Sequence, residues 1–121
     1  MTPNQIASWA ASGESETLEF KKSTAEKERA CRTLCSFANG QGGRLLFGVA
    51  PSGKAVGQTV ADHTLEELAQ EFQGFEPPLF PQVERVDVGA GREVLALTVA
   101  RAGRPPPSGP GRPAGRPWPR S

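Results

Sequence analysis

Residues 36–49 read SFANGQGGRLLFGV, and this stretch decides the fold. The dipeptide at 39–40, Asn-Gly, suits the end of a helix because both residues adopt positive φ readily. The two glycines at 42–43 predict a sharp turn or a close approach by another backbone, where a Cβ would clash. The apolar run 45–49 is bounded by turn residues and is typical of a strand covered on both faces. The stretch therefore predicts a helix joined by glycines to a central strand.

Length and composition are typical of one domain with a single hydrophobic core. The chain has 121 residues, of which 36% are hydrophobic and 22% are charged. It has no run of about 18 apolar residues, which excludes a membrane-spanning helix. The N-terminus lacks a basic-then-apolar signal pattern, so we expect a cytoplasmic protein. Cys31 and Cys35 lie four residues apart in a helical pattern, and with one histidine in the chain they indicate neither a disulfide nor a zinc site.

Charge is distributed unevenly along the chain. Residues 1–100 carry nine Lys and Arg against 13 Asp and Glu, a net charge of −4. Residues 101–121 carry five arginines and no acid, a net charge of +5. This second segment is mostly Pro, Gly, Arg and Ala without periodicity, so we expect a folded domain at 1–100 and a disordered tail at 101–121. The tail has two interpretations: nonspecific binding of nucleic acid by spaced arginines, or the product of a shifted reading frame.

The hydrophobic periodicity elsewhere predicts further helices and strands. Helices are expected at residues 3–12, 25–38 and 65–73. Strands are expected at residues 18–21, 55–60, 83–88 and 93–99. The last two strands flank the turn Gly89-Ala90-Gly91 and predict a hairpin. Because residues 94–99 are apolar on both faces, we expect that strand at the centre of the sheet.

Glu14 and Glu19 form the first candidate site. Two carboxylates near the start of a strand can hold a divalent metal ion, Mg²⁺ or Mn²⁺, as cleavage of a phosphodiester needs. Glu16 is a third candidate ligand. The alternative is that all three are solvated surface acids.

Cations near the glycine turn form the second candidate site. Lysines on an exposed strand face and an arginine beside the turn can contact phosphates, and backbone N–H groups of the turn can add to this. The alternative is a solvated rim, or salt bridges to nearby glutamates. We predict that DNA or RNA contacts four cations and three glycines: Lys21, Lys22, Arg44, Lys54, Gly40, Gly42 and Gly43.

Residues 48–55 match the phosphate-binding pattern GxxxxGK and follow a predicted strand. The pattern lacks the final Ser or Thr that would hold magnesium, and Pro51 removes an amide donor. The residues that follow predict a strand, whereas an ATP-binding loop of this kind must open a helix. We therefore interpret this segment as a hairpin turn rather than a nucleotide site.

Three motifs taken together resemble the Schlafen AlbA_2 family: ESxxLEFK at 14–21, FANGxGGxLxxGV at 37–49 and GKxVG at 53–57. The resemblance covers roughly residues 10–100. It implies an α/β (α+β) fold in which about three helices flank a mixed β-sheet. Domains of this family, also called divergent AAA-4 domains, are described in bacteria as DNA-binding modules of transcriptional regulators.

The resemblance also bears on the acidic residues. Animal Schlafen proteins with RNase activity use three carboxylates, and two of these match Glu14 and Glu19. The third falls near the acids that follow the second motif, where this chain has Ala50 and Pro51. The resemblance therefore favours nucleic-acid binding without catalysis, with a metal-dependent nuclease, or its inactive relic, as the alternative.

The family domain continues beyond the last predicted strand with an arginine- and proline-containing segment and another strand. Residues 101–105 begin such a segment, but no strand pattern follows. We expect either a chain shortened by a frame shift, which lacks a C-terminal domain, or a sheet that ends early with an open edge prone to homo-oligomerisation. The acidic body leaves a further alternative open, a protein-interaction domain or a nonfunctional fragment.

Overall fold

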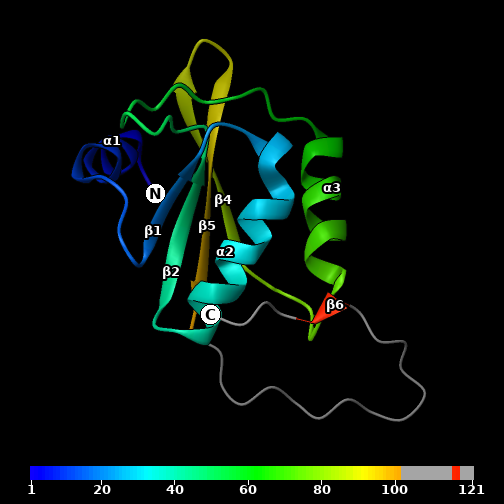
Figure 1. Ribbon diagram of the computed structural model, residues 1–121. Helices are drawn as coiled ribbons and strands as arrows, with labels where there is room; N and C mark the ends of the chain where they lie inside the picture. The colour runs from blue at the N-terminus through cyan, green and yellow to red at the C-terminus, as the bar shows by residue number, and fades with distance from the viewer. Residues whose placement is uncertain (102–115, 118–121) are drawn as a thin grey trace.

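The computed structural model describes residues 1–101 and 116–117, which form a mixed four-stranded sheet with helices on both faces (Figure 1). This architecture confirms the predicted α+β class. The helices are α1 (Pro3–Ser12), α2 (Lys27–Asn39) and α3 (Asp62–Gln73), with a 3-10 helix at Thr24–Glu26. The strands are β1 (Leu18–Lys21), β2 (Gly42–Phe47), β3 (Phe75–Glu76), β4 (Gln82–Gly89), β5 (Arg92–Ala100) and β6 (Arg116–Pro117).

The main sheet has the order β1-β2-β5-β4. Strand β1 runs parallel to β2, and the register aligns Leu18 with Arg44. Strand β5 is antiparallel to both of its neighbours, and its residue Thr98 lies opposite Arg44 on the β2 side. The central positions of β2 and β5 confirm the predictions drawn from their continuous apolar runs. Among the described strands of this sheet, β1 and β4 form the edges.

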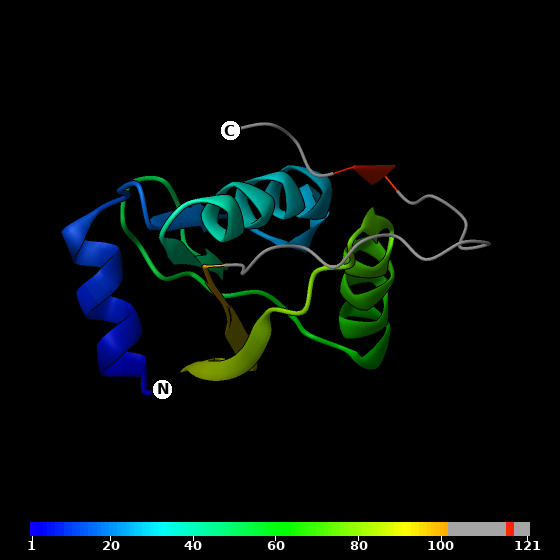
Figure 2. The same ribbon diagram turned by 90° about the horizontal axis from the view of Figure 1, so that it is seen from below.

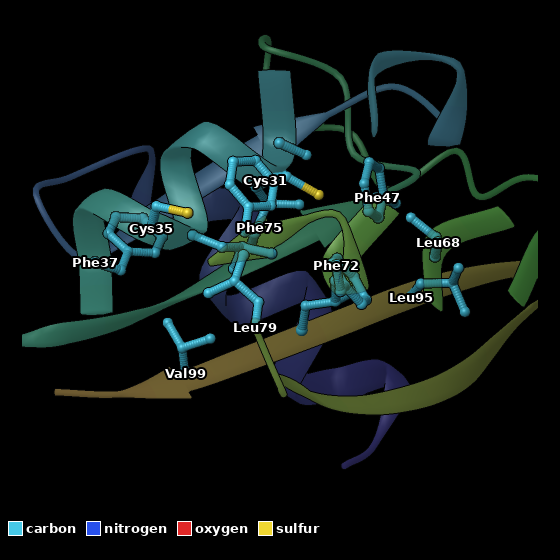
Figure 3. Close-up of a cluster of buried hydrophobic side chains, with 14 residues drawn as sticks. Cys31, Cys35, Phe37, Phe47, Leu68, Phe72, Phe75, Leu79, Leu95 and Val99 are labelled. Atoms are coloured by element: carbon cyan, nitrogen blue, oxygen red, sulfur yellow. The ribbon is translucent and has the colours of Figure 1, made fainter. Parts of the chain in front are cut away.

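Alternation along β2 divides the interior into two cores. Leu45 and Phe47 face α2 and α3, whereas Leu46 faces α1. Figure 2 views the sheet from one end, with α1 on one side and α2 and α3 on the other. Figure 3 shows the α2–α3 core, in which Cys31 and Cys35 of α2 lie buried among aromatic and aliphatic side chains. Because both faces of β2 are covered, its apolar run has no polar positions.

Internal packing requires two of the glycines at the start of β2. Gly42 has φ +83°, and a Cβ there would lie 2.8 Å from the carbonyl oxygen of Val99. A Cβ on Gly43 would lie 2.6 Å from a ring carbon of Phe37. The helix end predicted at Asn39 and Gly40 is confirmed, because α2 ends at Asn39 and the Gly40 N–H donates to the carbonyls of Ser36 and Phe37. The expected positive φ is wrong, since Gly40 has φ −105°. The residue with positive φ is instead Gly42, where the chain enters β2.

The strand predicted at residues 55–60 is also wrong. The segment contributes only isolated bridges, Val49 with Ala55 and Gln58 with Glu93. Gly57 has φ +69°, and its backbone crosses that of Gly48. A Cβ on Gly48 would lie 2.9 Å from Cα of Gly57. This crossing turns the chain away from the extended path that a continuous strand requires.

Two further findings concern the termini and the helices. Most of the predicted disordered tail lies outside the described residues. The domain boundary predicted near residue 100 therefore stays a prediction. The segment was predicted without a strand, yet Arg116–Pro117 form β6, which pairs in parallel with β3. Within the described part of the chain, no helix is both long and apolar enough to cross a lipid bilayer.

Candidate nucleic-acid interface

Arg44 lies on the α1 face of the sheet, beside Trp9. Its guanidinium carbon is 4.0 Å from the centroid of the Trp9 ring, the geometry of a cation–π contact. Its Nε donates to Oγ1 of Thr98 at 3.3 Å. Across residues 1–101, no carboxylate forms a salt bridge with Arg44. The arginine is therefore held in one orientation while its charge remains available.

Lys21 lies on the opposite face of the sheet. It pairs in register with Phe47, so its side chain emerges on the α2 side. Its Nζ is 4.0 Å from Oε2 of Glu19, and only 12% of the side chain is exposed. This is the salt bridge that the sequence left open as an alternative. The structure therefore separates Lys21 from Arg44, and the role of Lys21 in binding stays a prediction.

Lys22 and Lys54 lie at the far end of the sheet from the glycine turn. Lys22 directly follows the C-terminal end of β1. Lys54 lies in the turn after β2, where Ala50 N–H donates to the Lys54 carbonyl at 2.8 Å. Arg44 is near the N-terminal end of β2, so five residue steps, or about 16 Å, separate it from Val49. The Lys54 turn nevertheless packs on the α1 side, because a Cβ on Gly53 would lie 2.7 Å from the carbonyl oxygen of Ala10.

The glycine turn borders two small depressions. One has a volume of about 290 Å³ and is lined by Thr17, Gln41, Gly42, Gly43, Arg44 and Thr98. The other, of about 220 Å³, shares Thr17, Gln41 and Gly42 with it and extends toward α2. Their lining is rich in hydroxyl, amide and backbone groups. Gly42 and Gly43 are explained by internal packing, so the absence of their Cβ atoms does not by itself indicate an approaching ligand.

The two candidate metal ligands both have partners within the fold. Oε2 of Glu14 accepts a hydrogen bond from Phe20 N–H at 3.1 Å, at the edge of β1. Glu19 faces Lys21. Ala50 and Pro51 occupy a turn closed by Gly53 N–H at 2.9 Å from the Ala50 carbonyl. In the part of the chain that the structure describes, no three His, Cys, Asp or Glu side chains gather in a group able to hold a metal ion.

The near P-loop at residues 48–55 forms a turn, as predicted. Val49 and Ala55 bridge across it, and the next helix, α3, begins only at Asp62. A phosphate-binding loop presents its amides at a helix N-terminus that follows immediately, and this segment has none. The geometry therefore gives a nucleotide no site at this turn.

Two residues of this site were not found from the sequence. Trp9 lies in the helix predicted at residues 3–12 and was not among the candidate site residues. Thr98 was assigned to an apolar strand. The pairing of β2 with β5 brings Thr98 to Arg44, 54 residues apart, and the packing of α1 on the sheet brings Trp9 to it. The presence of tryptophan in a short helix is the signal that could have suggested a partner, since indole often combines an apolar body with a polar contact.

The fold and the site define an α+β domain with a polar depression at the start of its central strand. Comparison with family models matches residues 14–119 to the description "Schlafen, AlbA_2". The chain belongs to the Schlafen AlbA_2 family, which confirms the resemblance seen in its motifs. Membership suggests a nucleic-acid-related domain. No curated protein matches the chain at a significant level. The matched range begins after α1, so Trp9 lies outside it.

Proposed function

We propose that this chain is a nucleic-acid-binding module whose interface is the α1 face of the sheet. The observation that carries the proposal is Arg44, which contacts Trp9 and Thr98, has no carboxylate partner among the described residues and borders a polar depression. Lys54 lies in a turn packed against the same helix and adds a second cation. Arginine and lysine contacts to phosphates supply most of the affinity of such modules.

The distribution of acids supports this choice of face. Residues 1–100 carry a net charge of −4, so overall charge would not attract a polyanion. Helix α1, however, has no charged side chain. Helix α3, on the other side of the sheet, carries four acids: Asp62, Glu66, Glu67 and Glu71. A polyanion is therefore repelled most strongly from the α3 side.

The finer form of the proposal is that the ligand is DNA and that the module serves a cytoplasmic transcriptional regulator. This form is supported by the family resemblance, whereas the geometry of Arg44 suits either DNA or RNA. The nuclease alternative has less support, because Glu14 accepts from Phe20 N–H and, among the described residues, no third metal-binding side chain joins Glu14 and Glu19 in a group.

Fluorescence anisotropy across a series of salt concentrations tests the proposal. The double variant Arg44→Ala/Lys54→Ala removes two phosphate contacts, so the slope of log K against log salt should become shallower by about 1.4 for a single strand or 1.8 for a duplex. The control Arg29→Ala/Arg32→Ala removes the same charge from exposed positions of α2, on the opposite face of the sheet, and it should bind as wild type. Equal losses in the two variants, or no binding by the wild type, would refute the proposal.

A second candidate function, self-association, is favoured by a separate feature. An apolar groove of about 390 Å³ lies between α3 and β4, and Phe80 beside it is 83% exposed. Strand β4 is an edge of the described sheet, which offers unpaired backbone groups to a second copy of the chain. The groove and the edge together would fit an isologous dimer.

A further inference from the structure

The Arg44–Trp9 pair has the geometry of a stacking platform. The guanidinium is planar, and Trp9 covers one of its two faces at 4.0 Å. The Nε–H bond to Thr98 at 3.3 Å fixes the plane against rotation. Arg44 is half-buried and lines the depression of about 290 Å³. A flat ligand in this depression would stack on the second face of the guanidinium.

Both partners of the platform are anchored in the fold. Helix α1 is fixed to the sheet by Ile6 and Ala10, which are 0% and 3% exposed. Arg44 belongs to central strand β2, where its own N–H donates to the Thr17 carbonyl at 2.8 Å. Because both groups are already ordered, a ligand that stacks here loses little free energy to ordering the protein.

The adjoining depression suits one flat ring with polar edges. Its volume of about 290 Å³ is just below the range for ligand pockets, which begins near 300 Å³, so it has room for one small ring. Thr17, Gln41 and Thr98 line it with groups that can donate or accept hydrogen bonds. Bases of single strands stack on aromatic rings and guanidinium planes, whereas in a duplex both faces of each base are covered by its neighbours.

We infer that the Arg44–Trp9 pair stacks one unpaired base, so that the module prefers single-stranded nucleic acid to duplex. The inference rests on the proposed function and deepens it. Thr17 and Gln41 would bond the edge of the stacked base, and Lys54 would contact a phosphate of the same strand. Arg44 then acts through its planar guanidinium as well as through its charge, so lysine cannot replace it.

The test separates the plane of Arg44 from its charge. Anisotropy titrations of the full chain use three labelled probes: an oligodeoxythymidine, an abasic strand of the same length, and the thymidine strand paired with its complement. Arg44→Lys keeps the charge, and we expect it to weaken binding of the oligodeoxythymidine about 5- to 150-fold while binding of the abasic strand and the duplex stays unchanged. The matched control is Arg32→Lys on exposed α2, which should leave all three affinities unchanged.

A second measurement reports on Trp9 directly. The chain has two tryptophans, so Trp118→Phe leaves Trp9 as the only indole. Saturation with the oligodeoxythymidine should change the Trp9 emission, and the abasic strand should change it little. Circular dichroism melting of each variant verifies that the fold is retained.

The outcomes distinguish the inference from the proposed function. Wild-type binding with an equal effect of Arg44→Lys on thymidine and abasic strands, or no effect on either, would overturn base stacking and leave the nucleic-acid interface standing. Unchanged Trp9 emission at saturation would also overturn stacking. If the wild type binds none of the three probes, both base stacking and the proposed nucleic-acid interface are overturned.

Discussion

Gly43 lies where β2 passes beneath the ring of Phe37, and its replacement by alanine should destabilise the domain. An ideal Cβ would lie 2.6 Å from Cγ of Phe37 and within 2.9 Å of both Cδ atoms. Phe37 is 7% exposed and belongs to the α2–α3 core, so most of its ring is packed against neighbouring side chains that resist its displacement. The φ of Gly43 is not positive, so the effect of the substitution comes from crowding rather than from backbone strain.

The magnitude follows from overpacking. Forcing a methyl group into a packed core costs about 1–3 kcal/mol. In a domain of this size, each kcal/mol lowers Tm by about 4–8 °C, so Gly43→Ala should unfold about 4–24 °C below wild type. The matched control is Gly74→Ala, since Gly74 has φ −73° and ψ −7°, helical backbone angles that alanine adopts without strain. Thermal unfolding followed by circular dichroism measures both variants.

A double-mutant cycle identifies the cause of the loss. Phe37→Leu removes the ring that the new methyl group meets, so the double variant should be more stable than the sum of the single effects by about 0.5–3 kcal/mol. The reasoning is refuted if Gly43→Ala melts with wild type, or if the two substitutions are additive. If Gly43→Ala keeps its stability but loses nucleic-acid affinity, the glycine serves ligand approach instead.

Three other substitutions test separate parts of the structure. Arg85 donates two hydrogen bonds to Glu93 at 2.9 and 2.8 Å, which lower the pKa of that carboxyl. The ionised Glu93 carboxylate therefore stabilises the fold above its ordinary pKa of 4.5, and this contribution is lost as pH falls below that value. The Tm advantage of wild type over Glu93→Gln should shrink in the same pH range. Phe80→Ser should change Tm little, because the side chain is 83% exposed, and sedimentation should detect less dimer if the groove binds a second copy. Arg92→Lys should speed amide exchange in residues 55–60, since the Arg92 guanidinium donates to two carbonyls of that loop at 2.8 Å each; exchange equal to wild type would contradict this.

The sequence by itself determined which segments form the framework. The continuous apolar run at 45–49 predicted a strand covered on both faces, and β2 at Gly42–Phe47 is such a strand. Helix positions followed from 3.6-residue periodicity and caps, and the three motifs identified the family. These properties are local, because periodicity and capping depend on neighbours a few residues away. The same local reasoning failed at residues 55–60, where the crossing of Gly57 over Gly48 is a contact between distant residues.

Only the tertiary structure decided how the charged residues are distributed over the surface. Lys21 and Arg44 were predicted to act together, but they emerge on opposite faces of the sheet. The face on which a strand residue lies depends on register, and a shift of one residue would reverse it. Register was fixed by pairing β2 with β1 and β5, which also brought Thr98 and Trp9 to Arg44. No local pattern encodes that meeting, because the packing of α1 against the whole sheet determines it.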